Sequence, residues 1–173
     1  MLAALLILIF PFSMVYAAMS DLVTMTIANR VSLALVAAFP IAAVIVGLPA
    51  GAIGAHFAVG LVCLAVTFGM FAAGWMGGGD AKLLAATALW FGPTPLLAEY
   101  LLFGAIFGGV LTVAILLSRA SVAPVTGIYF VDRLLAPETG IPYGIALGAA
   151  GLAIFSGSFW MDHLVTGLAA VPL

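Results

Sequence analysis

The chain has 173 residues, of which 66% are hydrophobic and only 6% charged, with a formal net charge of −2 and a mean hydropathy of +1.40. A soluble domain carries about 25% charged residues and leaves much of its surface in water, so this composition excludes an ordinary water-soluble fold. Only four residues are basic, which excludes the electrostatic footprint of a nucleic-acid-binding protein.

Long apolar runs without polar alternation predict an all-α protein whose helices cross a membrane. The first run follows no basic residue, which favours a retained helix over a cleaved signal peptide. No boundary divides the chain, so we expect one integral-membrane domain over residues 1–173, a polytopic bundle of about six helices. The predicted helices, in chain order, are residues 2–19, 31–47, 52–73, 81–91, 96–117 and 141–159.

The fourth predicted helix is short. Residues 81–91 would rise only about 16 Å, whereas the hydrocarbon core of a bilayer is about 30 Å thick. This helix would have to include part of the preceding glycine run, thin the bilayer locally, or form a re-entrant segment.

The basic residues indicate how the chain crosses the membrane. With six crossings, every basic residue falls on one side, and both termini lie on the other. Basic residues flanking membrane helices favour the cytoplasm, so both termini are expected outside it. If the fourth helix did not cross, the last two basic residues would move to the opposite face. The four residues are Arg30, Lys82, Arg119 and Arg133.

Two aspartates are the strongest candidates for chemistry. Asp21 ends the first predicted helix and Asp80 begins the fourth. Two crossings separate them, so both belong on the cytoplasmic face at a common depth. Ionisable groups near a membrane interior are costly and are candidates for function. Two neighbouring carboxylates share a proton, so one can deprotonate water while the other polarises a peptide carbonyl.

The surroundings of Asp80 fit this chemistry but allow other interpretations. Gly77, Gly78 and Gly79 precede it; glycines take positive φ and let another backbone approach closely. Both aspartates could instead cap helices, since Asp is a preferred N-cap, or couple proton movement to transport in a small transporter or channel subunit. A transporter is expected to carry further polar groups at midplane depth, and the second, third and fifth helices have almost none.

Three segments together resemble the type IV prepilin peptidases. Residues 77–84 read GGGDAKLL, which is similar to the GxGD motif of that family. Asp21, followed eight residues later by Asn29, resembles the family's first catalytic region, D-x6-P-N, with Ala28 in place of the proline. Residues 141–146 resemble a third family segment at the start of the last helix.

The resemblance implies an intramembrane aspartyl endopeptidase with Asp21 and Asp80 as catalytic aspartates and no cofactor or metal. Its substrate would be a prepilin, whose leader is cut at the cytoplasmic face of the bacterial inner membrane just before the pilin's apolar helix. With a single cysteine, Cys63, and no room for an extra cytoplasmic domain, the chain resembles the short form of tight-adherence (Flp) pilus systems, which lacks the methyltransferase.

Other polar residues have lesser claims. Lys82 could bias proton sharing between the aspartates, meet acidic groups on the substrate, or extend to lipid headgroups. Asn29 could cap the second helix or orient the site. His56, Glu99 and Asp162–His163 fall on the opposite face. Residues 127–135 mix aromatic, apolar and charged side chains and predict a short interfacial helix, which could admit the leader or serve only as a linker.

Overall fold

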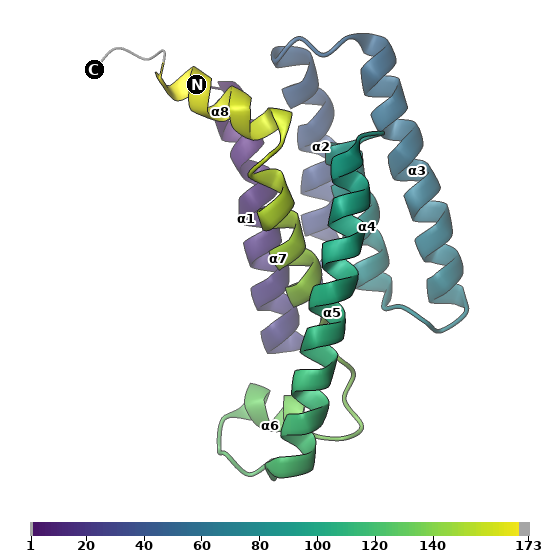
Figure 1. Cartoon of the computed structure of the whole chain (residues 1–173), viewed down its shortest axis with the longest axis vertical. Helices are drawn as coiled ribbons and strands as arrows, with labels where there is room; N and C mark the ends of the chain where they lie inside the picture. Colours follow the sequence, from purple (N-terminus) through teal and green to yellow (C-terminus); the bar gives the residue numbers. More distant parts are fainter. Residues whose placement is uncertain (1, 170–173) are drawn as a thin grey trace.

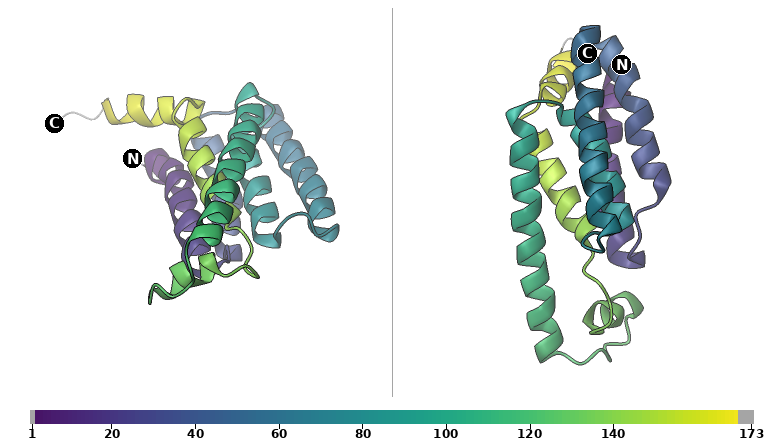
Figure 2. Two further views of the ribbon diagram at one scale, coloured as in Figure 1. Left: turned by 60° about the horizontal axis from the view of Figure 1, so that its bottom comes forward. Right: turned by 90° about the vertical axis from the view of Figure 1, so that its right-hand side faces the viewer.

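The computed structural model describes residues 2–169, and within this range the chain forms eight helices and no strands. Six of them run along a bundle, while α6 and α8 lie at its two ends (Figures 1 and 2). The all-α polytopic bundle of about six helices is therefore confirmed. The helices are α1 (Leu2–Thr24), α2 (Asn29–Ile45), α3 (Ala50–Ala72), α4 (Gly78–Phe91), α5 (Pro95–Ser121), α6 (Tyr129–Leu135), α7 (Tyr143–Phe155) and α8 (Phe159–Ala169).

Three helices in the described range, α1, α3 and α5, have the length and hydropathy of membrane spans. The helices α7 and α8 would together pass as a fourth span, although they are bent by 59° at their junction. Large apolar side chains point away from the bundle; Phe12 on α1 is 69% exposed and Leu61 on α3 is 65% exposed. Such an apolar outer surface is stable in lipid, and the chain is a membrane protein.

The prediction of one helix over residues 141–159 is wrong. The chain instead ends α7 at Phe155 and starts α8 at Phe159. Ser156 Oγ donates to Ala153 O at 2.6 Å and Ser158 Oγ donates to Phe155 O at 2.7 Å. Serine side chains that bond to nearby backbone in this way compete with the helical ladder, so the break falls at this serine-rich turn.

The short helix α4 lies at the centre of the bundle. It packs against α2 and α3 and also touches α7, and every residue from Leu83 to Phe91 is buried. Its 14 residues rise about 21 Å. Because neighbouring helices bury α4 from Leu83 to Phe91, this helix does not have to match the thickness of the bilayer by itself.

Glycines bring α7 close to both of its main neighbours. A Cβ atom at Gly148 would lie 2.8 Å from Met14 O on α1, and one at Gly108 of α5 would lie 2.7 Å from Tyr143 Cε1 of α7. Gly104 and Gly108, four residues apart on α5, therefore form a small-residue packing surface against α7, as expected for helices that associate in lipid.

An aromatic cluster closes the end of the bundle away from α6. Phe10 and Phe155 stack there with ring centroids 4.2 Å apart. Trp90 Nε1 donates to Leu35 O at 3.0 Å, and Trp160 Nε1 donates to Trp90 O at 2.8 Å. His56 Nδ1 lies 2.8 Å from Leu89 O, at the last turn of α4. This histidine is thus at the opposite end of α4 from Asp80, as the sequence predicts.

Candidate active site

Four helix ends meet at the end of the bundle nearest α6. They are the last turn of α1 and the first turns of α2, α4 and α7. Asp21 belongs to the first of these and Asp80 is the third residue of α4. Both aspartates lie beside Ile27: a Cβ atom at Gly79, next to Asp80, would lie 3.2 Å from Ile27 Cβ, and one at Gly144, which bonds Asp21, would lie 2.8 Å from Ile27 Cδ1. The structure therefore brings the two aspartates together, at the common depth that the basic residues indicate.

Asp21 is buried, with 6% of its surface exposed. Its Oδ2 atom accepts a hydrogen bond of 2.7 Å from the backbone N–H of Gly144. Gly144 is in the first turn of α7, whose N-cap residue Pro142 provides no side-chain cap. The N–H groups of a first helical turn have no acceptor within their own helix. The carboxylate of Asp21, on α1, provides the acceptor for one of these N–H groups in α7. This bond fixes the position of the carboxylate.

Asp80 is not the N-cap of α4. Gly77 occupies that position, in an extended conformation with φ −67° and ψ 142°. A Cβ atom at Gly77 would lie 2.7 Å from Asp80 Oδ2, so the carboxylate folds back over the start of its own helix. Asp80 Oδ1 is buried and has no hydrogen-bond partner among the described residues. A buried oxygen without a donor is energetically costly.

The sequence analysis noted that the three glycines before Asp80 could adopt positive φ angles, but none of them does so in the structure. Among the described glycines with positive φ, none belongs to the 77–79 run. Their role is close contact instead. A Cβ atom at Gly78 would lie 3.2 Å from Phe71 Cε2 of α3, and one at Gly79 would lie 3.2 Å from Ile27 Cβ. The first turn of α4 is thus bare backbone held between α3 and the α1–α2 connection.

Ile27 and Gly144 are site residues that the sequence analysis missed. Ile27 is buried in the connection between α1 and α2. A Cβ atom at Gly144 would lie 2.8 Å from Ile27 Cδ1 and 2.8 Å from Asp21 Cβ, so Ile27 fills the space between the starts of α4 and α7. Both residues lie inside the segments that resemble the prepilin peptidases, and this position was the one sequence feature that could have identified them as site residues.

The connection between α1 and α2 turns sharply. Met25 has a positive φ of 56°, which is uncommon for a residue other than glycine. The hydroxyl of Ser20 donates to Thr26 O at 2.9 Å and holds this turn. Ala28, the N-cap of α2, has φ −66° and ψ 138°. Proline has the same φ, so the substitution of proline by alanine leaves the local backbone in the conformation that proline would impose.

Lys82 and Asn29 join the starts of α4 and α2. Lys82 Nζ donates to Asn29 Oδ1 at 2.9 Å. Lys82 comes two residues after Asp80, which corresponds to about 200° around the helix. The ammonium group therefore lies on the face of α4 opposite Asp80 and does not extend toward the aspartates.

Two arginines hold α6 beside the site. Arg133 of α6 donates to Val23 O, two residues after Asp21. Arg119 at the end of α5 donates to Leu134 O and Thr139 O, both at 2.8 Å. The short helix predicted within residues 127–135 is present as α6, and these contacts place it next to the last turn of α1.

A comparison with protein families identifies the family of the chain. A family model described as the type IV leader peptidase family matches residues 8–118. The matched region contains Asp21, Asn29, the glycine run, Asp80 and Lys82, and it ends within α5, before Gly144. No curated protein and no solved structure matches the chain.

Proposed function

The chain belongs to the type IV leader peptidase family, and we propose that it is an aspartyl endopeptidase that removes the leader of type IV-like prepilins, with Asp21 and Asp80 as its catalytic pair. Cleavage takes place at the cytoplasmic face of the bacterial inner membrane. The substrate is a prepilin of the Flp type, and the chain acts as one domain without methyltransferase activity.

The state of the two carboxylates carries the proposal. Asp21 Oδ2 accepts a hydrogen bond from the backbone N–H of Gly144, and a hydrogen bond donated to a carboxylate favours its ionised form. Asp80 Oδ1 is buried near Asp21 and has no donor among the described residues, which favours a proton on that side of the pair. We therefore assign Asp21 as the general base and Asp80 as the general acid.

The reaction follows from this assignment. Asp21 takes a proton from water as the water oxygen bonds to the carbonyl carbon of the scissile peptide. Asp80 gives its proton to the carbonyl oxygen, which forms a neutral tetrahedral intermediate. When the intermediate collapses, the C–N bond breaks, the amine leaves with the proton held by Asp21, and Asp80 recovers its own. Positioned proton transfers of this kind typically contribute 10²–10⁴-fold each to a rate.

Three buried hydroxyls favour a peptidase over a proton-coupled transporter. Thr67, Thr87 and Ser158 are buried, and each hydroxyl donates to a backbone carbonyl. These hydroxyls serve helix backbone, whereas a transporter is expected to place its polar groups around a substrate at the midplane. The paired carboxylates lie at one end of the bundle instead.

The test replaces each aspartate by asparagine in the full chain and measures leader removal from a membrane-embedded prepilin by mass spectrometry. Asn keeps the shape of Asp but does not exchange a proton in the same way. We expect Asp21→Asn and Asp80→Asn each to lower the rate about a thousandfold or more. The exposed Asp162 in α8 offers the matched control, and Asp162→Asn should keep full activity. Normal processing by both site variants would exclude the mechanism.

The absence of methyltransferase activity has its own test. The mature pilin released in the presence of S-adenosylmethionine should have the mass of an unmodified N-terminus. A methylated product made by the purified chain would contradict this part of the proposal without affecting the peptidase assignment.

A further inference from the structure

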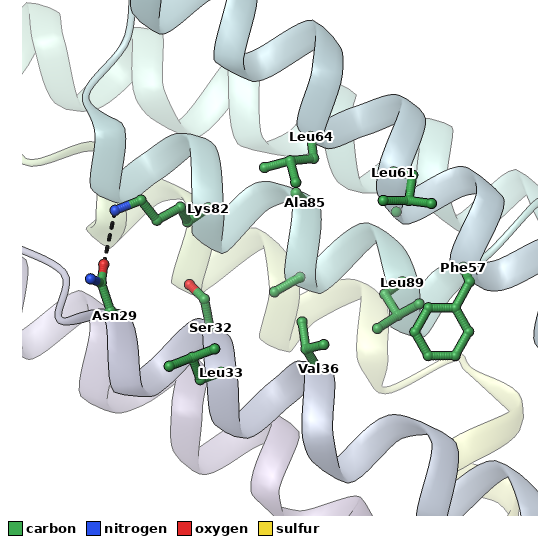
Figure 3. Close-up of a pocket in the computed structure, with 12 residues that line it drawn as sticks. Asn29, Ser32, Leu33, Val36, Phe57, Leu61, Leu64, Lys82, Ala85 and Leu89 are labelled. Carbon is green, nitrogen blue, oxygen red and sulfur yellow. Dashed lines mark hydrogen bonds between the residues drawn. The ribbon is translucent and has the colours of Figure 1, made fainter.

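A groove opens between α2, α3 and α4 (Figure 3). It has a volume of about 490 Å³. Its lining on α4 consists of Lys82, Ala85, Ala86 and Leu89, a spacing of i, i+3, i+4 and i+7 that marks one face of a helix. The lining repeats this spacing on α2, between Asn29 and Val36, and on α3, between Phe57 and Leu64. The groove therefore runs parallel to three helices for about 10 Å.

The groove has a floor of small side chains and high apolar walls. Ala85 and Ala86 of α4 lie at its base, where they are largely buried. The walls include Leu33 of α2, 66% exposed, and Leu61 of α3, 65% exposed. Contacts between α2 and α3 are sparse compared with those that each makes to α4, so the two walls stand apart. Small residues let another helix approach closely in lipid, where shape and packing rather than hydrophobicity drive association.

We propose that this groove holds the first turns of the substrate's apolar helix, the segment that directly follows the scissile bond. The inference rests on the proposed function, because it requires that the substrate be a protein with a membrane helix. It adds a substrate-binding surface on the side of α4 opposite the aspartates.

Continuity with the candidate active site supports this occupant over a lipid chain. Lys82 at one end of the groove is two residues from Asp80, on the opposite face of α4. A chain leaving the groove reaches Asp80 only by passing over the first turn of α4. That turn consists of Gly78, Gly79 and Asp80 itself, with Gly77 exposed before it. Phe71 and Ile27 pack against Gly78 and Gly79, so the chain would cross at the exposed Gly77, where an added Cβ atom would lie 2.7 Å from Asp80 Oδ2.

Charge also distinguishes the end of the groove nearest Asp80. Asn29, Ser32 and Lys82 are the polar members of an otherwise apolar lining. Lys82 Nζ uses one of its three donors on the neutral amide of Asn29 (Figure 3). The ammonium charge is therefore complementary to a carboxylate on the substrate near the start of its helix, whereas the far end, between Phe57 and Leu89, accepts only apolar side chains.

Adjacent residues of α3 provide a matched pair for the test. Leu61 faces the groove and Val62 does not, although Val62 is equally open to lipid at 63% exposure. Both native side chains are more than 60% exposed, so tryptophan at either position leaves the core intact. Two substrates are compared: a full-length prepilin in lipid nanodiscs, and a soluble peptide that contains the cleavage site but lacks the apolar helix.

We expect Leu61→Trp to raise KM for the full-length prepilin about tenfold and leave kcat within about twofold, because it blocks ground-state docking and not the chemistry. Val62→Trp should change neither parameter, and both variants should cleave the soluble peptide at the wild-type rate. Lys82→Glu should also raise KM for the prepilin, and more at low salt than at high salt.

Three results would overturn the inference. The first is an unchanged KM in Leu61→Trp while the prepilin is still processed, which leaves the peptidase assignment intact. The second is an equal rise in KM for both tryptophan variants, which points to a general effect of lipid packing. The third is a photoreactive residue at position 61 that crosslinks only lipid in the presence of bound prepilin. Failure of wild-type protein to cleave either substrate would instead refute the proposed function itself.

Discussion

The two ends of α4 differ sharply. At its C-terminal end, the indole N–H of Trp90, the indole N–H of Trp160 and the imidazole of His56 each have a backbone carbonyl partner, and aromatic rings surround them. At its N-terminal end, three glycines replace side chains, and Asp80 Oδ1 is buried without a partner among the described residues. The indole and imidazole groups at one end are each paired with a carbonyl, whereas the acid at the other end keeps an unpaired oxygen.

The difference indicates that one end of α4 stabilises the fold while the other end carries the reactive groups. A buried carboxylate without a donor destabilises the fold, and a glycine turn contributes little packing. The aromatic cluster at the other end can offset both, since buried aromatic side chains contribute most per residue. Proteins commonly tolerate strain or unsatisfied groups at a functional site because the rest of the fold compensates.

The strongest test of this contrast is the stability of the Asp80→Asn variant. Leader removal should fall about a thousandfold or more, while the melting temperature in detergent should stay the same or rise, because the costly buried acid is removed. A large loss of stability together with activity would show that Asp80 is a structural residue.

Trp90→Ala should have the opposite profile. Trp90 is 1% exposed, and its removal leaves a cavity and deletes the hydrogen bond from its indole to Leu35 O, which should cost about 3–5 kcal/mol of stability. Cleavage per folded molecule should be nearly normal. Trp75, 79% exposed just before α4, is the matched control; Trp75→Ala should change stability by about 0.5 kcal/mol or less. Reversible unfolding in mixed micelles measures both.

Gly144→Ala should damage the site with a smaller effect on stability. The added Cβ would meet Asp21 Cβ and Ile27 Cδ1, both at 2.8 Å, and displace the carboxylate. A shift of this size should lower kcat about a hundredfold and cost about 1–3 kcal/mol. Gly140→Ala lies in the same segment with nothing within 4 Å of its added Cβ, and it should be silent. Equal activity in the two variants would argue against the Gly144–Asp21 contact.

The smallest expected effect is that of Ala28→Pro. Because Ala28 already has φ −66°, proline should fit and stabilise the fold by about 0.4–1 kcal/mol through the unfolded chain, with activity unchanged. Ala34→Pro, inside α2, should instead cost about 3 kcal/mol. Destabilisation by Ala28→Pro would mean that the turn before α2 depends on the alanine N–H.

Particular elements show how far the sequence could be interpreted. The fourth predicted helix, 81–91, began too late, because glycines are poor helix formers; α4 starts at Gly78 and so includes part of the glycine run, one of the three possibilities that its short length left open. The last predicted helix was continuous, because apolar composition does not reveal a 59° bend. The opposite placement of His56 and the common end of the two aspartates were correct, since both follow from the number of crossings.

The sequence by itself determined the solvent, the helical class, the face of the bundle on which Asp21 and Asp80 meet, and the family resemblance that the comparison supports. These depend on composition, on segment order and on short motifs, which are local properties. Only the tertiary structure decided that Gly144 holds Asp21, that Ile27 separates the starts of α4 and α7, and that a groove lies behind Asp80. Each of these depends on atoms from helices far apart in the chain, and no local pattern fixes how such helices pack.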